Sequence, residues 1–113
     1  MTPTTAQRWE TKRTQETRQV EHALRDAGFE RVDAYRFNSA SIRLRVIDSR
    51  FEQLSAEKRD ALIEPYLESL PERTQADIVN LLTLAPSELQ PGRTTFGEYL
   101  NNAEFEDPRP SML

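Results

Sequence analysis

The residue types that carry most acid–base and metal chemistry are scarce in this sequence. His22 is the only histidine, and there is no cysteine. A lone imidazole with no partner visible in the sequence does not make a catalytic triad, and a chain without cysteine has no thiol nucleophile, disulfide or zinc–thiolate site. His22 is one step off an apolar stripe, so we expect it at the edge of the core or on the surface. A metal ligand or a general base is the alternative for this residue.

Carboxylates are the second candidate for chemistry. A paired-carboxylate site would draw on Asp48, Asp60, Glu64 and Asp77. A different set of acidic residues recurs at helical spacing: Glu57, Asp60, Glu64 and Glu68. This spacing is typical of the solvated face of an amphipathic helix, and we expect that arrangement in place of a catalytic pair.

Phosphate binding by a glycine-rich loop is not supported either. The three glycines are far apart, at positions 28, 92 and 97. A loop that cradles phosphates needs several glycines close together, because its backbone must approach the ligand closely. With no nucleophile, metal or phosphate constellation, the sequence predicts no enzyme, no cofactor and no metal site.

Arginines are the most interesting binding candidates. Five of them stand on or beside two predicted strands and the following helix: Arg36, Arg43, Arg45, Arg50 and Arg59. One interpretation is a basic sheet face that contacts phosphates or an acidic partner. The other is a set of exposed strand positions whose long side chains cover the sheet. Because we expect Tyr35 and Phe37 on the buried side, the face lacks the aromatic platforms that stack on nucleic-acid bases.

Charge is distributed unevenly along the 113 residues. Residues 1–50 hold ten Arg/Lys and seven Asp/Glu, whereas residues 51–113 hold five and twelve. A pI near 5.1 argues against strong nonspecific binding to DNA, which depends on neutralising many phosphates. There is no run of 18 apolar residues and no apolar segment of the secretory type in MTPTTAQRWETKRTQ. We therefore expect a cytoplasmic protein with no membrane contact.

A helix and a hairpin are predicted in the first half. Residues 5–27 show helical spacing in their second part, and Gly28 is placed as a C-terminal cap. Val32 to Phe37 and Ser41 to Ile47 are predicted as strands, with Ser39 and Ala40 as the turn. This turn pairs Phe37 with Ile42 and Tyr35 with Leu44, which puts both aromatics on the buried face and Arg36, Arg43 and Arg45 on the open one.

Two helices and a last strand are predicted in the second half. Ser55 is placed as a helix N-cap, and the following apolar stripe consists of Leu62, Ile63, Tyr66, Leu67 and Leu70. Pro65 predicts a kink or a break near Asp60 to Glu64. Pro71 is expected to open a second helix, and Val79 to Leu84 is expected to be a strand.

The predicted class is α+β, with the order α-β-β-α-α-β and a three-stranded sheet covered on one face by helices. Residues 18–89 form the domain, residues 1–17 a polar N-terminal extension, and residues 90–113 a C-terminal appendage. The segment Phe96 to Phe105 is either a docking helix or a cover that folds back on the sheet. We expect the fold-back.

Three stretches of this sequence resemble the BolA family: SIRLRVIDSRFEQLS, RDALI and LPERTQADIVNLLTLAPSE. The positions that match are Phe51, Leu54, Ser55, Arg59, Leu62, Ile63, Leu84, Pro86 and Glu88. The likeness covers about residues 18–89. It implies a small domain with a fold close to the type II KH domain.

The sequence departs from the family at the residues that matter for chemistry. The family's loop glycine falls at Gln53, so we do not expect a positive φ there. Its two histidines fall at Asp60 and at Asp77 or Val79. The second histidine resembles an iron–sulfur ligand that the family shares with a monothiol glutaredoxin. Since neither position here supplies an imidazole, we expect no cluster sharing.

We therefore expect a non-enzymatic interaction or regulatory module on a BolA-like scaffold, with an unidentified protein partner. The surfaces expected to contact it are the basic strand face, the loop from Asp48 to Ser55 and the C-terminal helix. Weak nucleic-acid binding through Arg36, Arg43 and Arg45 is the alternative.

Overall fold

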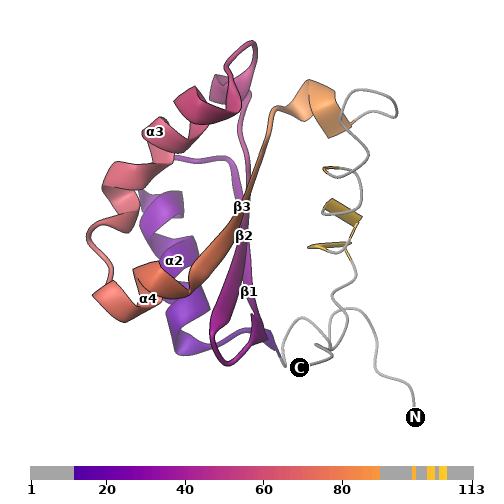
Figure 1. Cartoon of the computed structure of the whole chain (residues 1–113). Helices are drawn as coiled ribbons and strands as arrows, with labels where there is room; N and C mark the ends of the chain where they lie inside the picture. Colours follow the sequence, from indigo (N-terminus) through magenta and orange to yellow (C-terminus); the bar gives the residue numbers. More distant parts are fainter. Residues whose placement is uncertain (1–11, 90–97, 99–101, 104, 107–113) are drawn as a thin grey trace.

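In the computed structural model, the described residues are 12–89, 98, 102–103 and 105–106 (Figure 1). The elements are α2 (Gln15–Asp26), β1 (Arg31–Asn38), β2 (Ser41–Ile47), α3 (Ala56–Leu67), α4 (Glu72–Asp77) and β3 (Ile78–Leu84). Two short 3-10 turns follow β2 and β3, at η1 (Ser49–Phe51) and η2 (Pro86–Leu89). The predicted α+β class and the order α-β-β-α-α-β are confirmed.

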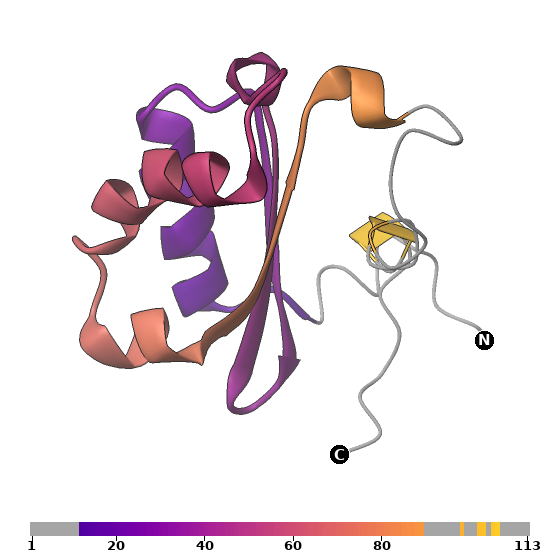
Figure 2. The ribbon, with the colours of Figure 1, turned by 45° about the horizontal axis from the view of Figure 1, so that its top comes forward.

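The sheet is mixed and has the strand order β1-β2-β3. β1 and β2 form an antiparallel hairpin, and β3 pairs with β2 in parallel after the crossover through α3 and α4. The three helices lie on one side of the sheet, and the described residues of the C-terminal segment lie on the other side (Figures 1 and 2). β2 is therefore the central strand, and β1 and β3 are the two edges.

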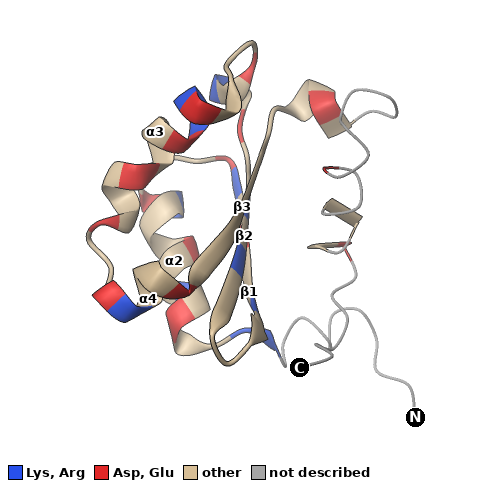
Figure 3. Ribbon diagram, in the orientation of Figure 1, with Lys and Arg blue, Asp and Glu red and all other residues tan. Residues whose placement is uncertain are grey.

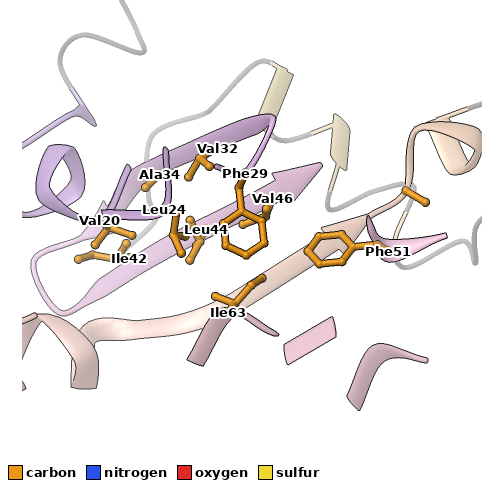
Figure 4. Close-up of a cluster of buried hydrophobic side chains, with 11 residues drawn as sticks. Val20, Leu24, Phe29, Val32, Ala34, Ile42, Leu44, Val46, Phe51 and Ile63 are labelled. Atoms are coloured by element: carbon orange, nitrogen blue, oxygen red, sulfur yellow. The ribbon is translucent and has the colours of Figure 1, made fainter. Parts of the chain in front are cut away.

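The main core lies between the sheet and the helices. Its buried side chains are Val20, Leu24, Phe29, Val32, Ala34, Ile42, Leu44, Val46, Phe51, Ile63 and Ala85, most of which are labelled in Figure 4. The alternation of Ile42, Leu44 and Val46 predicted this face of β2. Phe29 and Phe51 close one end of the core, with 6.1 Å between their ring centroids.

The pairing within the hairpin differs from the predicted register by one residue. The turn is at Ser39 and Ala40 as predicted, but the register shifts between Arg36 and Asn38, so that Tyr35 lies opposite Arg43 and Ala34 opposite Leu44. A bulge of this kind leaves one residue unpaired and moves every residue before it to the other face. Tyr35 therefore shares a face with Arg43, while Arg36 lies on the helix side.

The first helix begins later than predicted and ends where predicted. Residues 5–11 lie outside the described residues, and α2 starts at Gln15, with Thr14 as its N-cap. The Thr14 hydroxyl accepts from the Thr17 amide, and the Thr17 hydroxyl accepts from the Thr14 amide. At the other end Gly28 has φ 93°, which suits glycine. Residues 15–17, assigned above to the extension, thus belong to α2.

The predicted apolar stripe is only partly correct: Ile63, Leu67 and Leu70 pack into the core, whereas Leu62 and Tyr66 do not. Of the kink or break predicted near Asp60 to Glu64, a break does not occur, because the helix continues through Pro65 to Leu67. Arg59 and Ile63 are buried, whereas Leu62 and Tyr66 are 40% and 41% exposed. α4 begins one residue after Pro71, which is its N-cap. The buried stripe follows a spacing of four residues and includes an arginine, which the apolar pattern alone did not identify.

On the face of the sheet away from the helices, described residues of the C-terminal segment pack against the strands. Phe105 is fully buried against Tyr35, Ile47, Leu82 and Leu84. The Tyr35 and Phe105 rings meet edge to face, with 5.2 Å between centroids. At Phe105 the predicted fold-back is confirmed, whereas Phe96, Tyr99 and Leu100 lie outside the described residues.

The outer edge of β1 is covered by side chains of α2. The Ala34 amide donates to Oε2 of the buried Glu21, at 3.1 Å. The Val32 carbonyl accepts from Nη2 of Arg25, at 2.9 Å. Polar groups on this edge are thus satisfied within the chain.

The loop after η1 has a positive φ at a residue that is not glycine. Gln53 has φ 64°, so the expectation that this loop avoids the left-handed region is wrong. Its neighbours fix the conformation: Leu54 donates its amide to the Phe51 carbonyl, and Glu52 accepts from Ser87. The loop keeps the geometry although it lacks a glycine.

We expect Gln53→Gly to raise the free energy of unfolding by about 0.5–1 kcal/mol. Relief of the left-handed conformation stabilises the folded chain, and the greater freedom of glycine in the unfolded chain offsets part of that gain. Urea unfolding measures the change. Gln19→Gly is the control: it places glycine at an exposed position inside α2 and is expected to lower the free energy of unfolding by about 1 kcal/mol. A loss of stability in Gln53→Gly would contradict the strain argument.

Candidate protein-interaction surface

The arginines predicted to form one open face do not do so. Arg45 is only 1% exposed and lies between the sheet and the C-terminal segment. Its guanidinium contacts the Asp33 carboxylate at 2.6 Å and donates to Asn102 and Glu106 at 2.8 Å each. A buried arginine with two carboxylate partners stabilises the packing of this segment and presents no charge to a ligand.

Arg36 and Arg43 lie on opposite faces of the sheet because of the bulge. The Arg36 guanidinium lies 3.0 Å from the Asp77 carboxylate on the helix side, a charge contact without hydrogen-bond alignment. The Arg43 guanidinium stacks on the Phe37 ring, 3.9 Å from its centroid. The expectation of a continuous basic face formed by Arg36, Arg43 and Arg45 is therefore wrong.

Arg50 holds the loop that begins at Asp48. Asp48 is buried and accepts from the Arg50 amide, from the Arg50 side chain and from the Glu30 amide. Burial alone would raise the pKa of Asp48, but these hydrogen bonds and the guanidinium charge lower it overall. The guanidinium also lies 4.1 Å from the centroid of the Phe29 ring. Arg50 is thus a structural residue of this loop.

Arg59 ties the start of α3 to the end of β3. It is 8% exposed and donates to the carbonyls of Leu54 and Thr83, at 3.0 Å each, and to Glu88 at 2.6 Å. Burial acts to raise the pKa of Glu88, but the hydrogen bonds from Arg59 and from the Ala85 amide lower it overall. Arg50 lies within the loop predicted as a contact surface and Arg59 lies just after it, and both hold its shape.

The remaining candidates for chemistry are not gathered into a site. His22 is exposed and pairs with Asp26 at 3.1 Å, as expected of a surface histidine. Asp48 and Asp77 are each held by an arginine, whereas Asp60 and Glu64 lie on α3 and face a groove beside β3. Among the described residues, no group of three or more His, Cys, Asp or Glu side chains is arranged to hold a metal ion.

A groove between α3 and β3 is the surface that stands out. It has a volume of about 310 Å³ and is lined by Asp60, Glu64, Leu67, Glu68, Gln75, Ile78 and Leu81. Leu67, Ile78 and Leu81 form an apolar floor, because they pack against the edge of the main core. Asp60, Glu64 and Glu68 form an acidic rim along α3, and Figure 3 shows acidic residues recurring along that helix.

The rim carries negative charge that the fold does not neutralise. No Lys or Arg of the described residues forms an ion pair with Asp60, Glu64 or Glu68. Burial and the neighbouring charge of Glu64 raise the pKa of Asp60. Both effects oppose ionisation of Asp60, and a cation in the groove would act in the opposite direction on its pKa.

The groove runs beside an open edge of the sheet. β3 pairs only with β2, and no strand of the described residues pairs with its other edge. The Thr83 carbonyl points away from β2, because it accepts from Arg59, while the Leu84 carbonyl accepts from Asp48 at the end of β2. Since successive peptide groups alternate in direction, the amide and carbonyl of Leu81 also point away from β2.

Val79 marks the start of this open edge. The register shifts between Ile42 and Arg43, where Ile78 and Asn80 are the partners, so Val79 is the extra residue of a bulge. Its side chain is 64% exposed, the most exposed large apolar side chain on a strand of the described part of the chain. At this part of the outer edge, the exposed side chain of Val79 thus lies close to the outward-pointing amide and carbonyl of Leu81.

Comparison with known proteins supplies no relative. Protein-family models, curated proteins and solved structures were searched, and none matches this chain. None of the described helices has both the length and the apolar character that a bilayer crossing requires. The assignment of the groove and the β3 edge as an interaction surface therefore depends on their geometry alone.

Only part of this surface was visible in the sequence. The helical spacing of Asp60, Glu64 and Glu68 predicted a shared acidic face, but that face was expected on the solvated side of the helix and not beside a groove. Leu67 was predicted as part of the apolar stripe. The open edge was not predicted, because the order of strands in a sheet is not a local property of the sequence. The exposure of Val79 depends on a bulge for which the strand pattern gives no signal.

Proposed function

We propose that this protein is a non-enzymatic module that binds a partner protein along the outer edge of β3 and the adjoining groove. The observation that carries the proposal is the outer edge of β3, which no described strand pairs, beside an apolar floor and an acidic rim without a described cationic partner. Edge strands of stable monomers are normally covered or carry inward charges, and one left open beside a groove is a typical site for strand addition.

The scaffold that we propose is BolA-like. The observed order of elements and the helices on one face agree with the fold that the resemblance implies. We propose no iron–sulfur cluster sharing, because Asp60 lies on the rim of the groove and Asp77 is paired with Arg36. Carboxylates placed in this way are poor substitutes for an imidazole ligand. The cytoplasmic location stays a prediction.

The positions of the arginines argue against nucleic-acid binding through them. It requires Arg36, Arg43 and Arg45 on one accessible face, whereas Arg45 is buried and Arg36 is on the other side of the sheet. The carboxylates of Asp33 and Glu106 beside Arg45 would also repel a phosphate.

Val79→Lys is the variant that tests the proposed function. The Val79 side chain is largely exposed, so we expect the free energy of unfolding of the variant to be within about 0.5 kcal/mol of the wild-type value. A lysine at the edge opposes strand addition. Partners are captured with the wild-type chain and purified, and their affinity for the variant is measured by calorimetry. We expect the affinity of the partner for Val79→Lys to be at least tenfold lower than for the wild-type chain.

Asp26→Lys is the matched control. Asp26 is exposed at the last turn of α2, where a positive charge favours the helix dipole, and it is not among the residues that line the groove. The control must bind the purified partner as the wild-type chain does. Partners that bind Val79→Lys and wild type equally would show that the edge of β3 is not the interaction surface.

A further inference from the structure

We infer that the partner presents an extended basic segment, in which lysine or arginine alternates with an apolar residue, and that this segment adds as a fourth strand to β3. The inference rests on the proposed function, because it specifies the chemistry of the partner at the same surface. The structure supports it by geometry and by charge.

The backbone geometry sets the conformation of the segment. The Leu81 amide and carbonyl point outward, and the next outward carbonyl, of Thr83, is already bonded to Arg59. An added strand therefore pairs with the outward amide and carbonyl of Leu81 and stops before Thr83. Side chains of a strand point alternately to the two faces of the sheet, so every second residue of the segment faces the groove.

The groove sets the chemistry of the residues that face it. A side chain that enters from the edge passes over Leu81 and Ile78 before it reaches Asp60, Glu64 and Glu68 on α3. Lys and Arg match this order, because their apolar stems cover hydrophobic surface while their charged ends reach further. The apolar residues of the segment can pack against Val79, whose side chain is largely exposed at the start of this edge.

A second copy of this chain is a poorer occupant. Antiparallel pairing of two β3 edges would bring two identical acidic rims together, and like charges at close range oppose association. The rim also gains from a cationic ligand in particular, because the pKa of Asp60 is raised by burial and by the charge of Glu64. A basic segment relieves that repulsion, whereas a neutral or acidic segment does not.

The experiment titrates the full-length, isotopically labelled chain with end-blocked peptides of six residues. The first peptide alternates lysine and valine, the second alternates glutamate and valine, and the third is the first with methylated backbone nitrogens on its pairing side. We expect saturable NMR shift changes for the first peptide at the amides of residues 79–83 and 60–68, weakening as salt is raised. We expect at least tenfold weaker binding of the third and no binding of the second.

Variants of the chain check the charge contribution. Glu64→Gln is expected to weaken the lysine–valine peptide about threefold, as for one partly exposed ion pair. Val79→Lys is expected to abolish the shift changes, and Asp26→Lys to leave them unchanged.

Each other outcome overturns the inference in a distinguishable way. If the glutamate–valine peptide binds equally, the basic chemistry is wrong while the edge stands. If the methylated peptide binds as tightly as the unmethylated lysine–valine peptide, the segment binds by charge attraction and does not add as a strand. If no peptide binds, yet Val79→Lys still loses its purified partner, the inference fails and the proposed function stands. Sedimentation that shows a dimer broken by Val79→Lys would assign the edge to a second copy.

Discussion

Phe105→Ala is expected to lower the free energy of unfolding by about 3 kcal/mol. Phe105 is fully buried, and its ring contacts Tyr35 edge to face and lies beneath the Arg45 guanidinium. Removal of a buried phenylalanine side chain loses apolar burial and leaves a cavity, which together cost about 3–5 kcal/mol. We place the effect at the lower end, because relaxation of the chain around residue 105 can partly close the cavity.

Urea unfolding followed by circular dichroism measures this loss. Leu89→Ala is the control: Leu89 is 45% exposed, and its truncation is expected to change stability by less than about 0.5 kcal/mol. In the folded Phe105→Ala variant, the NMR signals of Tyr35 and Arg45 are expected to shift. A variant as stable as the wild type, with unshifted Tyr35 signals, would show that the sheet face does not depend on this segment.

Arg59→Met is expected to lower the free energy of unfolding by about 2–3 kcal/mol. The methionine retains the stem but leaves the Leu54 and Thr83 carbonyls and the Glu88 carboxylate without their donor. Breaking one side of a buried ion pair is costly because the remaining charge stays desolvated. Glu88 is about a quarter exposed, so water replaces part of the lost interaction. The double variant that combines Arg59→Met with Glu88→Gln is expected to recover part of the loss, which a double-mutant cycle measures.

The same contact sets how stability depends on pH. The pKa of Glu88 lies below its ordinary value of 4.5 in the folded chain, so its stabilising contribution is complete above that value and is lost as the pH falls through the folded pKa. Asp48 acts in the same direction from its ordinary value of 3.8. Arg59→Met is expected to flatten the acid side of the stability profile. An unchanged acid slope would show that Arg59 does not hold Glu88 ionised.

The alternation in β2 was sufficient to predict which of its residues face the helices. Ile42, Leu44 and Val46 are all buried, because a period of two fixes the face whatever the partner strand does. The turn at Ser39 and Ala40 was also predicted, and the Asn38 side chain accepts the Ala40 amide within it. The bulge beside Phe37 was not visible, and it moved Tyr35 to the arginine face.

The buried arginines could not be predicted from local patterns. Arg45 is stabilised by Asp33 across the hairpin and by Glu106, which is far away in the sequence. The correct register would have placed Asp33 opposite Arg45, but no local signal links Arg45 to residue 106. Arg59 likewise depends on Glu88 and on a carbonyl of β3. Long-range partners of this kind decide burial, so residue type alone made both arginines look like surface binding residues.

The two edges of the sheet differ. Glu21 and Arg25 of α2 bond to backbone groups of β1, whereas the backbone amide and carbonyl of Leu81 in β3 point outward. Growth by head-to-tail stacking would need both edges free. A sheet that is covered at one edge and open at the other can accept one added strand but cannot extend further. Each molecule should therefore bind a single partner segment, and its complexes should not form fibres.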